Sequence, residues 1–254
     1  MPRAHCLHRP GPKLPDWWRN FRAFTRNRRR HVSIINYASR EIQFKIVYYG
    51  PALCGKTTNL NYIHQRINPL NRGDLVSLAT ASERTLFFDF LPLNAVVIKG
   101  FVTKFQLYTV PGQVIYNATR QLVLRSVDGI VFVADSQWEK MEENVESFKN
   151  LSDNLALQNM VLDDVPCVLE YNKRDLPNIA PVNYMEYALN NRKKRSQSFE
   201  VISNTGQNVF ATLNAVSQVL LHKFSKQSQA AQGALLPVVV PVEPSAPETQ
   251  RLPA

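Results

Sequence analysis

Long apolar runs are missing from this 254-residue chain. No stretch approaches the ~18 apolar residues that suggest a membrane-spanning helix. The N-terminus, broken by Pro and Arg, also lacks the apolar segment of a secretory signal. With 44% hydrophobic residues the chain can still bury a core. Its length predicts one ordinary domain with tails.

Cysteine is also scarce. The three cysteines, Cys6, Cys54 and Cys167, follow no metal-ligand spacing, and an odd number cannot pair completely. Cys54 and Cys167 stand in apolar settings. We therefore expect reduced thiols and a cytoplasmic protein rather than a disulfide or zinc scaffold.

Acidic residues are nearly absent from residues 1–31, where nine Lys and Arg face Asp16 alone. This segment thus carries +8 of the total net charge of +10, and the other 223 residues carry only +2. The basic excess belongs to a tail and not to a face of the domain. The sequence therefore predicts no specific nucleic-acid partner.

Three zones divide the chain. Residues 1–31 form a basic, Pro-rich extension, residues 32–224 alternate strand-like and helix-like segments, and residues 225–254 are a tail of Ser, Gln, Ala and Pro expected to be disordered. Val32 fits a GTG start codon, so we expect residues 1–31 to be untranslated in the native protein. The alternative is a basic-aromatic anchor in peripheral contact with anionic membrane. Native peptides from residues 4–26 would favour that alternative.

The stretch "FKIVYYGPALCGKTTNL" carries the phosphate-loop spelling G-x-x-x-x-G-K-[ST]. An apolar strand-like run precedes it and a helix-like segment from Thr57 to Arg66 follows, which is the context that the motif needs. Backbone N–H groups at the start of a helix attract phosphate. Lys56 is expected to reach the β- and γ-phosphates, and the Thr57 hydroxyl to bind Mg²⁺. The expected nucleotide contacts of this loop are Gly50, Leu53, Cys54, Gly55, Lys56, Thr57 and Thr58.

A second motif, "NKRD" at residues 172–175, ends the apolar run "PCVLEYN". The Asp175 carboxylate can accept hydrogen bonds from the ring N–H and exocyclic amine of guanine, a donor pair that adenine lacks. Lys173 is expected to lie along the base. The loop "ISNTG" adds amides near the guanine carbonyl. Expected contacts of the base are Asn172, Lys173, Asp175, Ser203, Asn204 and Thr205. The sequence thus predicts GTP or GDP as the ligand.

Short apolar runs at residues 45–49, 129–136 and 166–172 suit strands buried on both faces. Apolar residues recur with helical spacing over 138–158 and 205–224. The runs "TLFFDFLPL" and "FVTKFQLYTV" suggest a hairpin. We predict an α/β fold with a mostly parallel, six-stranded-type sheet, one antiparallel edge strand and helices on both faces.

These motifs, with "INYASREI", "LYTVPGQVIYNATR" and "VDGIVFVADSQ", resemble the P-loop G domain of small Ras-like GTPases, and within them the bacterial MglA family. The resemblance covers residues 33 to about 224. It implies a switch that hydrolyses GTP and regulates cell polarity or surface motility, such as gliding or type IV pili. It also implies an activating roadblock-domain partner similar to MglB, downstream effectors and recruitment to a cell pole.

The resemblance also implies roles in hydrolysis. In "TVPGQ", Gly112 is expected to contact the γ-phosphate and Gln113 to orient the attacking water. Thr109 stands where Ras-like proteins carry a magnesium-holding Asp, and Asp89 is a candidate to replace it through a water. In the first switch, expected within "SLATASERTLFFDF", Thr85 is a metal-ligand candidate and Arg84 an arginine finger. The alternatives are an exposed Asp89 and a solvated Arg84.

Two departures from the family pattern leave a further alternative open. Thr109 weakens the expected metal site, and Ala52 adds a methyl group where related loops carry Gly. Either change is compatible with a scaffold that binds GTP with negligible turnover. A phosphate-loop ATPase or kinase is the third reading, and "NKRD" argues against it. Slow intrinsic hydrolysis is the expectation.

Overall fold

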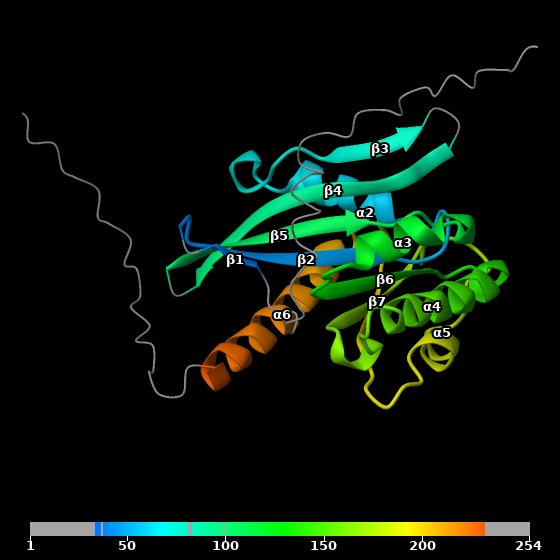
Figure 1. Ribbon diagram of the computed structural model, residues 1–254. Helices are drawn as coiled ribbons and strands as arrows, with labels where there is room; N and C mark the ends of the chain where they lie inside the picture. Colours follow the sequence, from blue (N-terminus) through cyan, green and yellow to red (C-terminus); the bar gives the residue numbers. More distant parts are fainter. Residues whose placement is uncertain (1–33, 37, 81–82, 99, 232–254) are drawn as a thin grey trace, which may run out of the picture. The chain divides into compact units, whose positions relative to one another are not determined.

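The fold is described from a computed structural model, in which residues 34–36, 38–80, 83–98 and 100–231 are described (Figure 1). The chain divides into two units, residues 1–32 and 33–254, and all described residues belong to the second. The predicted basic extension and residues 232–254 of the predicted tail thus lie outside the described residues. Residues 225–231 do not match the predicted disordered tail, because they continue helix α6, which ends at Ala231. No described helix is long and apolar enough to cross a membrane.

Eight strands and five α-helices make up the described domain. The strands are β1 (Ile34–Asn36), β2 (Glu41–Tyr49), β3 (Val76–Thr80), β4 (Glu83–Ile98), β5 (Phe101–Thr109), β6 (Gly129–Asp135), β7 (Cys167–Asn172) and β8 (Gln197–Glu200). The helices are α2 (Lys56–Arg66), α3 (Asn117–Leu124), α4 (Met141–Ala156), α5 (Val182–Leu189) and α6 (Val209–Ala231). Short 3₁₀ turns are η1 (Pro69–Asn71), η2 (Val114–Tyr116), η3 (Trp138–Lys140) and η4 (Leu162–Asp164).

The strands form a single sheet in the order β3-β4-β5-β2-β6-β7-β8, with β1 paired to β2. Five strands, β5, β2, β6, β7 and β8, run parallel, as predicted for crossovers through helices. The predicted hairpin is confirmed, because β4 pairs antiparallel with β5. The predicted α/β class is confirmed, but the sheet is larger than expected, since β1 and β3 add two further antiparallel strands.

Two apolar layers cover the two faces of the sheet. Along β2, Ile46 and Tyr48 pack in the layer beneath α2 and α6, whereas Val47 and Tyr49 pack in the layer beneath α3, α4 and α5. Figure 1 shows α6 on one side of the sheet and α3, α4 and α5 on the other. This alternation explains why β2 reads as a continuous apolar run: both of its faces are covered.

The segment expected to be the first switch is strand-like rather than a loop in this structure. Residues 76–80 form β3, and β4 begins at Glu83, so Arg84 and Thr85 lie on the backbone of β4. The register places Ser77 opposite Asp89. The extended hairpin therefore carries Asp89 toward the start of α2, where the phosphate loop ends.

Candidate functional site

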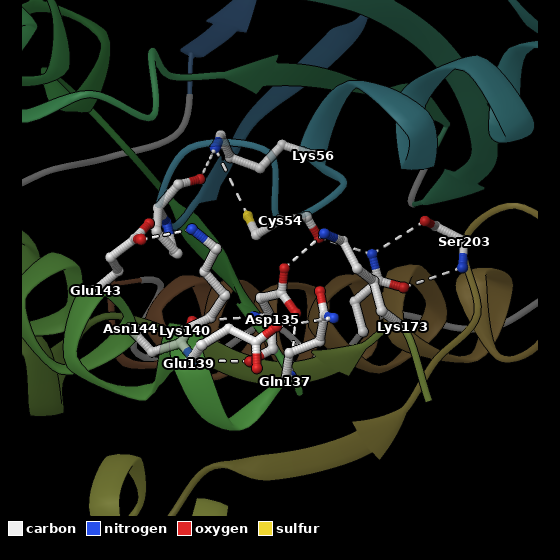
Figure 2. A network of polar contacts seen from close by, with 12 residues as sticks. Cys54, Lys56, Asp135, Gln137, Glu139, Lys140, Glu143, Asn144, Lys173 and Ser203 are labelled. Atoms are coloured by element: carbon white, nitrogen blue, oxygen red, sulfur yellow. Dashed lines mark hydrogen bonds and ion pairs between the residues drawn. The ribbon is translucent and has the colours of Figure 1, made fainter. Parts of the chain in front are cut away.

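The two sequence motifs meet at the carboxyl ends of the parallel strands β2, β6 and β7, shown in Figure 2. In open α/β sheets this edge is where ligands bind. The phosphate loop follows β2, and "NKRD" begins at the last residue of β7. The fold thus brings residues 50–58 and 172–175 together, although more than a hundred positions separate them in the sequence.

The phosphate loop ends at Gly55, whose φ of 105° favours glycine. A Cβ at Gly55 would also overlap the side-chain amide of Asn172. Helix α2 begins at Lys56, and the Lys56 ammonium donates to the carbonyl oxygens of Gly50 at 3.1 Å and Pro51 at 2.6 Å. Burial lowers the pKa of Lys56. The lysine is therefore held inside the loop, next to the helix N-terminus that can bind an anion.

Asn172 joins the two halves of the site. Its amide donates to the Cys54 carbonyl of the phosphate loop at 2.7 Å and to the Ser203 hydroxyl at 3.0 Å. The Ser203 backbone N–H donates back to the Asn172 side-chain oxygen at 3.0 Å. Asn172 and Ser203 are both buried. Asn172 and Ser203, both predicted to bind the base, thus hold the phosphate loop and the "ISNTG" loop together.

Lys173 is fixed by a residue that the sequence analysis missed. Its ammonium pairs with the Asp135 carboxylate at 2.5 Å, and Asp135 is buried at the end of β6 (Figure 2). The Gln137 N–H donates to the same carboxylate, while Asn144 of α4 bonds to the Asp135 backbone in both directions. The sequence did offer a signal for Asp135. It is an Asp at the carboxyl end of a buried strand, and this strand lies beside the one that carries "NKRD".

The other predicted contacts of the nucleotide differ in exposure. Asp175, Asn204 and Thr205 are exposed, and Asp175 makes no hydrogen bond or ion pair with another described side chain. Its carboxylate is therefore available to a ligand. Leu53 is 65% exposed in the phosphate loop, so only its backbone suits a phosphate. Thr58 is half-buried within the first turn of α2.

Cys54 is buried in the loop, and burial raises the pKa of its thiol. The thiol accepts from the Lys56 ammonium at 3.6 Å. A buried thiol with a raised pKa is a poor nucleophile. Cys54 therefore serves as a small loop residue here.

A cluster of oxygen atoms surrounds Asp89, which is buried rather than exposed. Hydroxyl groups of Thr57, Ser77 and Thr109 all donate to its carboxylate, at 2.6, 2.6 and 2.9 Å. The Asp89 N–H also donates to the Thr109 hydroxyl at 2.8 Å. The structure thus links Asp89 to both Thr57, the predicted metal ligand, and Thr109, which occupies the position of the missing Asp.

This cluster fits Mg²⁺, which prefers oxygen ligands and keeps several waters. No basic side chain among those described forms an ion pair with Asp89. Three hydroxyl groups donate to its carboxylate, and the buried Lys56 ammonium is close enough to interact with it electrostatically. No described group of three or more His, Cys, Asp and Glu is placed to hold a metal by itself. The phosphates of a bound nucleotide and waters would complete the shell around Thr57 and Asp89.

The second-switch segment "TVPGQ" lies against the phosphate loop. Gly112 approaches Ala52 so closely that a Cβ at Gly112 would overlap the Ala52 backbone. Gln113, the next residue, is exposed. The structure thus places Gly112 beside the phosphate loop, and its expected contact with the γ-phosphate stays a prediction. The side chains of Arg84 and Thr85 are outside the described residues, so their expected contacts stay predictions.

A buried carboxyl group connects the base-binding strand with the phosphate loop. Glu170 of β7 accepts from the Asn59 amide at 2.6 Å, and the same amide donates to the Gly55 carbonyl at 3.1 Å. The second Glu170 oxygen, the Tyr48 hydroxyl and the Asn59 side-chain oxygen are buried without a partner among the described residues. Burial raises the pKa of Glu170 to about 8. This residue was also missed, because "VLEYN" reads as an apolar strand.

Replacing Glu170 by Gln is expected to make folding less dependent on pH. The folded-state pKa is raised from 4.5 to about 8, so the unfolded chain releases this proton first as the pH rises. The group therefore destabilises the fold by about 1.4 kcal/mol for each pH unit between those values. Urea unfolding of Glu170→Gln at pH 5 and pH 8 should show the variant gaining stability over the wild type at pH 8.

The exposed Glu146 of α4 provides a matched control, because Glu146→Gln removes a carboxylate from the surface. This variant should follow the wild-type pH dependence. A Glu170→Gln variant with the same pH dependence as the wild type would contradict the proton uptake assigned to Glu170.

Comparison with known proteins gives two matches. The model of the ADP-ribosylation factor family matches residues 32–221. The "Mutual gliding-motility protein MglA" of Myxococcus xanthus (strain DK1622) is 55% identical over 195 residues, which cover 77% of this chain and 99% of that protein. The family match includes the phosphate loop, the Asp89 cluster and "NKRD".

Proposed function

Because the chain belongs to the ADP-ribosylation factor family of small GTPases, we propose that it is a guanine-nucleotide switch with slow intrinsic hydrolysis of GTP to GDP and phosphate. The observation that carries this proposal is the bond from Asn172 to the Cys54 carbonyl, which holds the base-binding and phosphate-binding loops as one site. A site for an adenine nucleotide would have no use for the free Asp175 carboxylate beside it.

For the metal, we propose that Thr57 and Asp89 hold Mg²⁺ together with the phosphates, and that Thr85 joins them in the GTP state. A bound Mg²⁺ would neutralise charge on the β- and γ-phosphates. The support is the direct 2.6 Å hydrogen bond between Thr57 and Asp89 and the absence of an ion pair to Asp89 among the described side chains. Asp89 would thus fill the role left by Thr109.

Asp89→Asn is expected to raise the Mg²⁺ concentration needed to retain the nucleotide by about 10- to 100-fold. The amide keeps the size of the side chain but lacks its charge. The release of a fluorescent GDP analogue, measured while Mg²⁺ is titrated, reports this change. Asp153→Asn, at an exposed position of α4, is the control. Identical Mg²⁺ dependence in wild type and Asp89→Asn would remove Asp89 from the metal site.

For hydrolysis, we propose that Gln113 orients the attacking water, Gly112 offers its N–H to the γ-phosphate, and Arg84 neutralises charge between the phosphates. Gln113 is exposed directly beyond Gly112, which rests on the phosphate loop. Arg84 is the second residue of β4, which begins at Glu83. In this proposal Arg84 moves onto the phosphates through a rearrangement of the start of β4.

The cellular role follows from the relative alone. The similar protein from Myxococcus xanthus is named as a gliding-motility protein, and we propose a role in cell polarity or surface motility for this chain. An MglB-like roadblock-domain protein as activator, effectors of polarity or motility, and a cytoplasmic location with recruitment to a cell pole belong to the same proposal. A partner of this kind should bind the GTP state better than the GDP state.

Nucleotide binding and single-turnover hydrolysis by the purified protein test the proposal. We expect tight binding of GTP and GDP, no comparable binding of ATP, and slow release of phosphate from GTP that an MglB-like protein accelerates. Tight GTP binding without turnover, with or without the partner, would favour the scaffold alternative. Equal binding of ATP and GTP would overturn the guanine assignment.

A further inference from the structure

Arg120 is a buried cation that neither sequence motif explains. Among the described residues it is the largest fully buried side chain, and it comes from α3. No described carboxylate lies within ion-pair distance of its guanidinium. Taking a charge out of water costs several kcal/mol, so a buried arginine needs other strong interactions.

Those interactions are made with the second switch. The Arg120 Nε donates to the Pro111 carbonyl at 2.8 Å, and Nη2 donates to the Gly112 carbonyl. The planar fork of the guanidinium thus grips two successive peptide groups. Both peptides precede Gln113, and Gly112 is the residue that rests on Ala52. Arg120 therefore fixes the positions of the Gly112 N–H and of the backbone that carries the Gln113 side chain.

The Arg120 guanidinium is held in place by Asn150 and Tyr49. Its Nη1 donates to Asn150 of α4 at 2.8 Å, and its charge lies 5.3 Å from the centre of the Tyr49 ring. The Tyr49 hydroxyl donates to the same Asn150 oxygen at 2.6 Å, and Asn154 donates to the Tyr49 hydroxyl at 3.1 Å. Tyr49 is the last residue of β2, directly before Gly50. Tyr49 thereby fixes the position of the Arg120 guanidinium relative to the phosphate loop.

We propose that Arg120 is the positioning residue of the second switch: its fork fixes the Pro111 and Gly112 peptides relative to the phosphate loop, and so places Gly112 and Gln113 for γ-phosphate recognition and water attack. The proposal rests on the proposed GTP hydrolysis. Arg120 acts through the peptide groups, since its donors are already directed to protein acceptors.

Electrostatics supports this arrangement. Lys56 and Arg120 are both buried cations on the two sides of the same loop contact, and Arg120 adds to the burial that lowers the pKa of Lys56. Two close cations favour an incoming anion, and Asp89 offsets only part of their repulsion on the Lys56 side. The charge of a γ-phosphate would relieve their repulsion, whereas GDP would leave more of it in place.

The test compares Arg120→Lys with the wild type, because lysine keeps the charge but loses the fork. Single-turnover GTP hydrolysis should fall by about 10- to 100-fold, the loss expected for slightly misplaced groups. GDP affinity should stay within about threefold, because the guanine site and Lys56 are unchanged. Amide hydrogen exchange of residues 110–116 in the GDP-bound protein should accelerate by about tenfold, the equivalent of one lost hydrogen bond.

Two further variants complete the experiment. Asn150→Ala removes the anchor behind the fork and should give the same changes to a smaller extent, which keeps the test valid if Arg120→Lys folds poorly. Arg125→Lys, at the exposed end of α3, should leave hydrolysis and exchange at wild-type values.

The outcomes separate positioning from general stability. A parallel loss of GDP affinity, thermal stability and hydrolysis in Arg120→Lys would indicate a merely structural role and overturn the proposal. Unchanged exchange of residues 110–116 in both Arg120→Lys and Asn150→Ala would overturn it as well. If the wild type failed to hydrolyse GTP, the proposed function would fall, while the exchange measurements would still decide whether Arg120 holds the segment.

Discussion

Arg84→Ala and Gln113→Leu are each expected to lower partner-stimulated GTP hydrolysis by about 10³-fold or more, while GTP still binds. Gln113→Leu removes the group proposed to orient the water but leaves the Gly112 backbone and the phosphate loop intact. Arg84→Ala removes the positive charge proposed to stabilise the departing γ-phosphate. If Arg84 is this arginine, the partner need only hold both side chains in place.

Single-turnover hydrolysis with a saturating MglB-like partner, together with GTP affinity, measures both effects. Arg195→Ala and Gln197→Leu are suitable controls, since both side chains are exposed near the start of β8, whereas the site lies at the carboxyl ends of the parallel strands. Full stimulation of Arg84→Ala would place the arginine, or its substitute, elsewhere.

Asp175→Asn is expected to lower GDP affinity by about 10² to 10³, a cost of about 3 to 4 kcal/mol. The amide cannot accept both hydrogen bonds from the guanine ring N–H and amine, so polar groups on both molecules lose a partner. Xanthine carries a carbonyl oxygen in place of that amine, so Asp175→Asn should bind xanthine nucleotides better than the wild type does.

The gain with xanthine nucleotides separates a change of specificity from a loss of fold. Lys56→Ala provides the contrast, because it removes a phosphate contact and should weaken guanine and xanthine nucleotides alike. Competition between GDP and xanthosine diphosphate, measured for Asp175→Asn and for Lys56→Ala, gives the ratio of the two nucleotide affinities for each variant. If Asp175→Asn lost affinity for both bases equally, Asp175 would not read the base.

The parts of the fold that the sequence predicted well have strong local patterns. The apolar runs of β2, β6 and β7, the start of α2 after Gly55, and the β4–β5 hairpin all appear where expected. β3 was expected within a switch loop instead. It is a short edge strand, and the two of its side chains that are described, Val76 and Ser77, are exposed, so they give no apolar signal of a buried strand face.

The residues of the candidate site also divide into those that the sequence predicted and those that it did not. The phosphate loop and "NKRD" are continuous motifs, so their residues could be named from spacing alone. Arg120, Asp135 and Glu170 could not, because their importance lies in contacts with residues 8 to 111 positions away in the chain. Each is a charged or ionisable group that becomes informative only once its burial is known.

The amide of Asn172 has a consequence for how long a nucleotide stays bound. It ties the loop that would hold the phosphates to the loop that would flank the base, with bonds of 2.7 and 3.0 Å. We therefore expect that a bound nucleotide does not free one end while the other stays fully held, because disturbing either loop strains the same side chain. Dissociation would then require both loops to open together, and the slower of the two motions would set the residence time.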